Sequence, residues 1–231
     1  MCTGFIPADT FNTSGWLYET NQRSMPIILS LEQQPLDPLD LLRITIPKDG
    51  NFKFPPQTLI TFYEDRNFQG KSHECSGDNA DLHSYFARCN SIRVENGCWV
   101  IYERSNYMGH QYYLKKGDYP EYQSWLGLND SIRSCHSIPN HRGFYRIRLY
   151  DREDFHGQMK EYVTDCSNIY ESFHVHDVLS CNVLEGYWII FEETGFKGNQ
   201  YFLRPGEYRR YSSWGAANSR VGSLKKIMDF Y

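Results

Sequence analysis

The chain has 231 residues, of which 16% are aromatic, and its 24 basic and 28 acidic residues leave a net charge of −4. This balance excludes a protein that binds nucleic acid through a strongly basic surface, and no apolar run approaches the roughly 20 residues that span a bilayer. The first residues, MCTGFIPADT, lack the charged and apolar regions of a signal peptide, so we expect a cytoplasmic protein.

Residues 1–57 contain no internal repeat, and their apolar patch PIILSLEQQPLDPLDLLRITI is interrupted by prolines. Because proline breaks a helix, a long helix is not expected here. We expect disorder and an exposed Trp16. An interaction arm and a non-standard first exon or gene-model artefact are the two alternatives, and the intact mass of the native protein would show whether the segment exists.

Four copies of one pattern follow: an aromatic residue, an acid, a second aromatic five residues after the first, and a glycine two residues later. They are YEDRNFQG, YERSNYMG, YDREDFHG and FEETGFKG, which end at Gly70, Gly109, Gly157 and Gly198. The glycines are 39, 48 and 41 residues apart, which defines a repeat of roughly 40 residues with one longer step in the middle.

Each repeat reads as β-structure, because TLITFYE, CWVIYE, YRIRLYD and YWIIFE are rich in β-branched and aromatic residues. The repeated glycine is expected where a hairpin folds back over its sheet, in a turn that needs positive φ or leaves no room for a Cβ. A serine later in each repeat is expected to bond the exposed backbone of that hairpin. These serines are Ser91, Ser134, Ser180 and Ser223.

A longer period of 89 residues groups the four repeats into two pairs; Gln111 and Tyr112, for example, recur as Gln200 and Tyr201. Each pair is about 85 residues long, which suffices for a domain with one core. The stretch PNHRG between the pairs reads as a linker. We expect domains at 58–140 (motifs about 58–97 and 98–139) and 145–231 (motifs about 145–186 and 187–230), joined by residues 141–144.

The folded hairpins with late serines, paired into two domains, resemble the βγ-crystallin superfamily. The segments CNSIRVENGCW, NDSIRSC, CNVLEGYW, RPGEYRRY and VGSLKKIMDFY are similar to vertebrate lens γ-crystallins over about residues 58–231. This resemblance implies an all-β protein of two domains, each a β-sandwich of two Greek-key motifs. It also implies a structural protein of the lens fibre cytoplasm, a monomer that meets other lens crystallins through weak short-range contacts.

The resemblance further implies three interface positions in each domain: Val100, Tyr113 and Ile138, and their counterparts Ile189, Phe202 and Ile227. Strand alternation supports two of them. Val100 and Ile189 directly follow Trp99 and Trp188, so they point away from the core that those tryptophans occupy and require a second apolar partner. Together with Trp125 and Trp214, these tryptophans are expected to be buried.

Rival functions are a calcium-binding module and a non-lens interaction module. The family's calcium pattern is degenerate in all four windows, and the best one, NDSIRS, has Arg133 where a hydroxyl ligand is needed. No nucleophile elbow, HExxH motif or phosphate-binding loop is present, so we expect neither an enzyme nor a cofactor.

His174 and His176 would share a face if their segment were extended and could form an adventitious zinc or copper contact, but two solvated histidines are the preferred interpretation. With an odd number of cysteines and no CxxC pair, the chain is expected to keep reduced thiols that are prone to late oxidation. Six of the seven are Cys75, Cys89, Cys98, Cys135, Cys166 and Cys181.

Overall fold

The computed structural model describes residues 58–228, so the expectations for residues 1–57 and for Trp16 lie outside the described residues. Within this range the protein consists of antiparallel sheets, five short 3-10 turns and one five-residue helix, α1 (Ile169–Phe173). The predicted all-β class is confirmed. No helix of the described range is long and apolar enough to cross a membrane.

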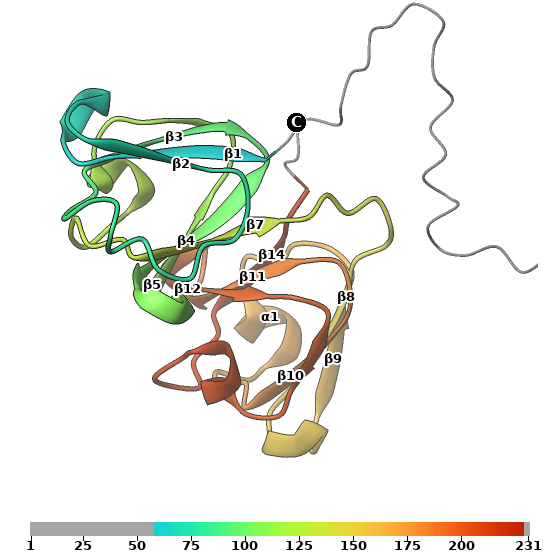
Figure 1. Ribbon diagram of the computed structural model, residues 1–231. Coiled ribbons are helices and arrows are strands. Elements are labelled where there is room, and N and C mark those ends of the chain that lie inside the picture. Colours follow the sequence, from blue (N-terminus) through green and yellow to red (C-terminus); the bar gives the residue numbers. More distant parts are fainter. Residues whose placement is uncertain (1–57, 229–231) are drawn as a thin grey trace, which may run out of the picture. The chain divides into compact units, whose positions relative to one another are not determined.

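The N-terminal domain contains two sheets (Figure 1). The first has the order β2-β1-β3-β6 and is built from β1 (Leu59–Tyr63), β2 (Ser72–Cys75), β3 (Ser91–Asn96) and β6 (Gly117–Tyr119). The second contains β4 (Cys98–Arg104), β5 (Met108–Leu114) and β7 (Ser134–Ile138), with β4 in the middle. Alternate residues of β1, such as Ile60 and Phe62, point into the core between these sheets.

The two repeats of this domain are intercalated. The second repeat contributes β6, which pairs with β3 of the first, and the first contributes Asn79, whose backbone bridges Cys135 on β7. Each repeat thus completes the other's sheet, so neither repeat can bury its apolar face alone.

The C-terminal domain repeats this arrangement. One sheet has the order β13-β10-β8-β9, and β11 lies in the middle of the other, between β12 and β14. The strands are β8 (Arg146–Tyr150), β9 (Met159–Tyr162), β10 (Ser180–Glu185), β11 (Trp188–Glu193), β12 (Lys197–Leu203), β13 (Gly206–Tyr208) and β14 (Ser223–Lys226). Intercalation recurs too, since β13 pairs with β10 and Cys166 bridges Leu224 on β14.

Each repeat folds its first hairpin over the sheet, in three repeats through a 3-10 turn. These turns are η2 (Arg66–Phe68), η3 (Ser105–Tyr107) and η5 (Glu153–Phe155), while the fourth repeat has an irregular turn that includes Gly195 and Phe196. The four repeat glycines all have φ between 77° and 83°. At Gly70 a Cβ would also lie 2.7 Å from Oδ2 of Asp65, so that side chain would have to move, and positive φ is the reason for glycine that applies in all four repeats.

The late serine joins the folded hairpin to the sheet in every repeat. In the first repeat Oγ of Ser91 donates to the carbonyl of Asp65 at 2.6 Å and accepts from the amide of Phe68 at 2.9 Å. The other three serines make the same two bonds at 2.6–3.0 Å, and all four side chains are fully buried.

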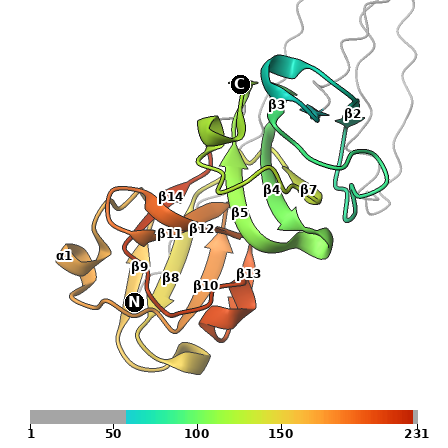
Figure 2. The same cartoon turned by 90° about the vertical axis from the view of Figure 1, so that its left-hand side faces the viewer.

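The second sheets of the two domains meet edge to edge. Strand β12 pairs with β5 through Gln200 and Gln111, giving one six-stranded sheet in the order β14-β11-β12-β5-β4-β7. Figure 2 shows β5 and β12 side by side at the boundary between the domains. Three hydrophobic clusters result: one inside each domain and a third that contains residues of both.

Candidate functional site: the interface between the domains

The third hydrophobic cluster lies where the domains meet. It contains five of the six residues that the resemblance assigned to an interface, each at most 8% exposed, namely Val100, Ile138, Ile189, Phe202 and Ile227. The sixth, Tyr113, is half-buried and packs against the same cluster, and its hydroxyl donates to Sγ of Cys98 at 3.4 Å. The structure therefore brings all six residues together.

Other members of this cluster were missed at the sequence level, including Cys98, Tyr102 and Phe191. The sequence did contain a pattern that would have identified these three residues. Cys98 and Tyr102 lie two residues on either side of Val100, and Phe191 lies two residues after Ile189, so each shares a strand face with a predicted member. Extending the alternation along β4 and β11 would have found them.

Two glutamines hold the strand pair at the centre of the interface. Oε1 of Gln111 accepts the amide of Phe202 at 2.9 Å, and Oε1 of Gln200 accepts the amide of Tyr113 at 3.0 Å. Because β5 and β12 pair through a single residue pair, these side chains replace further backbone bonds and satisfy amides that would otherwise be buried without acceptors. Both glutamines were recognised as a repeat pair but not as interface residues.

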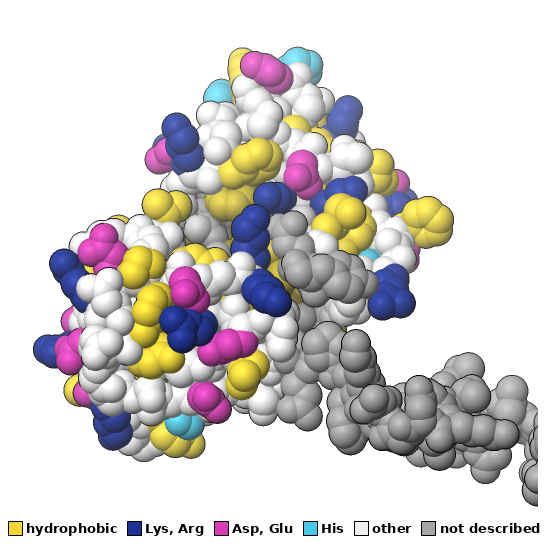
Figure 3. All heavy atoms as spheres, turned by 90° about the horizontal axis from the view of Figure 1, so that it is seen from above, with side chains coloured by type: hydrophobic (Ala, Val, Ile, Leu, Met, Phe, Trp, Pro, Cys, Tyr) yellow, Lys and Arg dark blue, Asp and Glu magenta, His cyan; other side chains and the backbone are white. Residues whose placement is uncertain are grey.

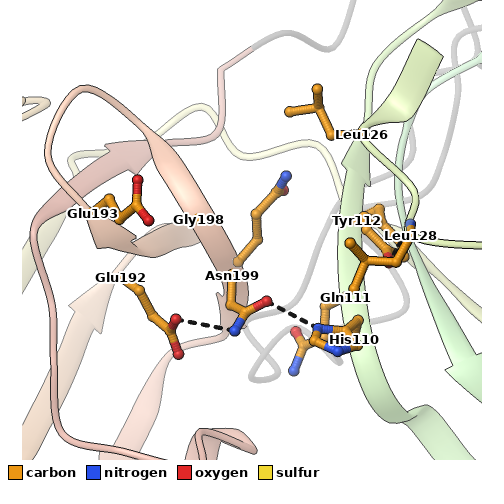
Figure 4. Close-up of a pocket in the computed structure, with 10 residues that line it drawn as sticks. His110, Gln111, Tyr112, Leu126, Leu128, Glu192, Glu193, Gly198 and Asn199 are labelled. Carbon is orange, nitrogen blue, oxygen red and sulfur yellow. Dashed lines mark hydrogen bonds between the residues drawn. The ribbon is translucent and has the colours of Figure 1, made fainter. Parts of the chain in front are cut away.

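A hollow of about 340 Å³ lies beside this strand pair (Figure 4). A hydrogen-bond chain crosses it from one domain to the other: Nδ1 of His110 donates to Oδ1 of Asn199 at 2.9 Å, and Nδ2 of Asn199 donates to Glu192 at 3.0 Å. Glu192 also accepts the hydroxyl of Tyr201 at 2.7 Å. Burial raises the pKa of that hydroxyl, and the adjoining carboxylate adds to the effect.

The lining of this hollow combines polar and apolar side chains. Its lining includes no serine, threonine or cysteine that could act as a nucleophile. Its carboxylate Glu192 accepts three hydrogen bonds, the third from Asn218 at 3.2 Å. Of these bonds, the one from His110 to Asn199 joins the two domains, and the three accepted by Glu192 lie within the C-terminal domain.

The best of the degenerate calcium windows is occupied by its own side chains. The guanidinium of Arg133 donates to the carbonyl of Ala87 at 2.6 Å and to that of Ile132 at 2.9 Å. Oδ1 of Asn129 accepts the amide of Ser131 at 2.8 Å. The Asn129 oxygen thus accepts a hydrogen bond from its own loop, and the guanidinium of Arg133 repels a cation.

A metal contact of His174 and His176 would require their segment to be extended, and it is not. His174 has φ +62° and ends α1, so the segment is not extended, and the ring of His176 stacks on Tyr170 with centroids 4.2 Å apart. Among residues 58–228 no group of three or more His, Cys, Asp or Glu side chains could hold a metal ion.

The remaining predicted residues lie in the domain cores. Trp99 and Trp188 are fully buried, and each indole donates at 3.2 Å to a carbonyl three residues earlier, Asn96 and Glu185. Trp125 and Trp214 are 3% and 4% exposed. Five of the six thiols of the described range are buried, while Cys166 is half-buried.

Comparison with known proteins agrees with the two-domain fold described above. The family model described as Beta/Gamma crystallin matches residues 59–138 and 146–227. γ-Crystallin B of Bos taurus is 60% identical over 172 residues, which cover 74% of this chain and 98% of the relative. γ-Crystallin M2 of Chiloscyllium indicum is 58% identical (74% and 97% covered), and γ-crystallin 2 of Rana temporaria is 57% identical (72% and 99% covered).

Proposed function

The chain belongs to the βγ-crystallin family, as a vertebrate γ-crystallin and a structural protein of the eye lens, and we propose that it serves there as a non-enzymatic monomer that packs densely in the fibre-cell cytoplasm. The observation that carries this proposal is identity of about 60% to γ-crystallins over almost their whole length.

The surface supports a role at high concentration. Acidic and basic side chains alternate over the face shown in Figure 3, and the hydrophobic side chains there form separate small groups. A mixed face of this kind favours weak short-range contacts over aggregation. Arginines also outnumber lysines 15 to 9, and with the aromatic residues they supply polarisable groups that raise the refractive index.

Two measurements test this proposal. Antibody staining of lens sections should place the protein in the cytoplasm of fibre cells, and its absence from the lens would overturn the assignment. Sedimentation equilibrium of the purified full chain should return the mass of one chain, 27.3 kDa, and solutions should stay clear as concentration rises. A stable dimer mass would contradict the monomer.

A further inference from the structure

Asp78, at the rim of the domain interface, binds groups from both domains. Its Oδ1 accepts the amide and the hydroxyl of Ser137 at 2.8 and 3.0 Å, and its Oδ2 accepts Nδ1 of His136 at 2.7 Å. The same Oδ2 lies 3.7 Å from Nη2 of Arg204, which belongs to the C-terminal domain. One carboxylate oxygen is therefore shared between an imidazole of its own domain and a guanidinium of the other.

The imidazole of His136 is held in a defined position on β7. Its ring stacks on that of Tyr107 with centroids 3.7 Å apart. It also lies edge-to-face with the ring of Tyr102, with centroids 5.7 Å apart. The side chain is only 13% exposed. Burial lowers the pKa of His136 below its ordinary value of 6.5; Asp78 opposes this change and the Arg204 charge adds to it.

The pKa values of Asp78, Tyr102, Tyr107 and Cys135 all move away from neutrality. Burial disfavours the charged form of Asp78, but the hydrogen bonds from Ser137 and His136 outweigh it and keep its pKa below the usual value. Burial raises the pKa of Tyr102 and Tyr107, and the neighbouring Cys75 thiol together with burial raises that of Cys135. His136 is thus the member whose charge changes in the mildly acidic range.

Solvent reaches the network from two sides. A hollow of about 200 Å³, lined by Asp78, Ser137, Tyr187 and Arg204, lies on one side. Another of about 330 Å³, whose lining includes His136 and again Arg204, lies on the other. Protons can therefore exchange with His136 while the domains stay docked.

We propose that Asp78, His136 and Arg204 form a proton-linked latch, which holds the domains together at neutral pH and loosens when His136 binds a proton. With neutral His136, the full charge of Asp78 attracts Arg204. With protonated His136, the imidazolium neutralises Asp78 and faces the guanidinium across the interface. Like charges then oppose docking.

The direction of the pH effect follows from linkage. Undocking removes Arg204 and part of the burial, so the pKa of His136 rises toward 6.5 in the undocked state. The undocked state consequently binds more protons in mildly acidic solution, and docking weakens as the pH falls below that value. Above it both states carry neutral His136, and the contribution of the latch is complete.

An NMR titration of the histidines in the full chain tests the link across the interface. We expect the pKa of His136 to shift upward in Arg204→Met. Arg209→Met is the matched control, because Arg209 pairs with Glu207 and Asp154 within its own domain, and it should leave His136 unchanged. An unchanged pKa in Arg204→Met would overturn the proposal.

Equilibrium unfolding of the full chain tests the consequence for docking. Between about pH 7.5 and 5.5, the unfolding midpoint of the native protein should move to lower denaturant, whereas in His136→Gln, which keeps a donor for Asp78 but does not titrate, it should move less. Equal shifts in the two proteins would show that other groups cause the pH dependence and would reject the latch.

Discussion

Four aromatic residues have a backbone conformation that bulky side chains rarely adopt. Phe68, Tyr107, Phe155 and Phe196 all have φ of 62° or 63°. A left-handed conformation costs roughly 1–2 kcal/mol at such residues. Two contacts offset it in each repeat: the buried serine accepts the aromatic residue's amide, and the ring lies edge-on to the first aromatic of the repeat with centroids 5.6–5.8 Å apart.

Replacing one of these serines should destabilise its own domain. Ser180→Ala removes the acceptor for the amide of Phe155 and the donor to the carbonyl of Arg152, leaving buried backbone groups unpaired. We expect a loss of about 1–3 kcal/mol, measured by denaturant unfolding of the C-terminal domain. Thr164→Ala, at an exposed position of the same domain, is the control, and a loss no larger than that of the control would contradict this role for the serine.

Thiol reactivity should follow burial. Cys89 and Cys181 are fully buried, and burial raises their pKa, which suppresses the reactive thiolate. Cys166 is half-buried. Brief treatment with iodoacetamide should therefore alkylate Cys166 before those two, as measured by peptide mass spectrometry, and this order should disappear in denaturant. Earlier labelling of Cys89 would mean that the N-terminal domain opens more readily than its packing indicates.

At the scale of elements, β4 and β11 are buried on both faces. In β4, Trp99 and Ile101 enter the core of the domain, whereas Val100 and Tyr102 enter the interface cluster. The outer edges of the six-stranded sheet are covered by acids: Asp78 accepts the amide of Ser137 on β7, and Asp165 accepts that of Lys226 on β14. Such capping blocks pairing with strands of other molecules.

Truncating the interface should uncouple the domains. Phe202 is 8% exposed and contacts the interface cluster, so Phe202→Ala should weaken docking by about 1–3 kcal/mol, a loss of apolar packing discounted for partial exposure. One domain should then unfold before the other, and denaturation followed by tryptophan fluorescence should show an intermediate. Phe144→Ala, at a side chain that is 83% exposed, is the matched control. A Phe202→Ala curve that matches the native one would remove Phe202 from the interface.

At the scale of the whole molecule, net charge sets how copies interact in solution. The chain carries −4 at pH 7 and has a pI near 6.1, so mutual repulsion is small at neutral pH and falls further toward the pI. Static light scattering should show a more attractive second virial coefficient as the pH is lowered from 7 to the pI. Added salt should reduce this difference because it screens the charges, and a coefficient independent of pH would show that charge has little part in these contacts.

The sequence predicted features that follow from strand alternation or from the repeats. It did not predict which residues far apart in the chain come into contact. Alternation along β4 separates Trp99 from Val100, and the 89-residue offset relates the two domains. The left-handed aromatics were not foreseen, because the repeated glycine was taken to supply the turn. The contact of Asp78 with Arg204 joins residues far apart in the chain and lies outside any periodic pattern. His110 and Asn199 are related by the 89-residue offset, but that offset does not indicate that equivalent residues of the two domains touch. The short α1 has no amphipathic period to reveal it.

The single residue pair between β5 and β12 has a consequence for how the molecule stays closed. Backbone pairing through one residue pair would contribute little between separate chains, but the residues that connect the domains keep each at an effective concentration on the order of millimolar around the other. Closure is then a unimolecular equilibrium that dilution does not affect. Cutting the chain between the domains would make it bimolecular, and the halves would separate at low concentration although each kept its own core.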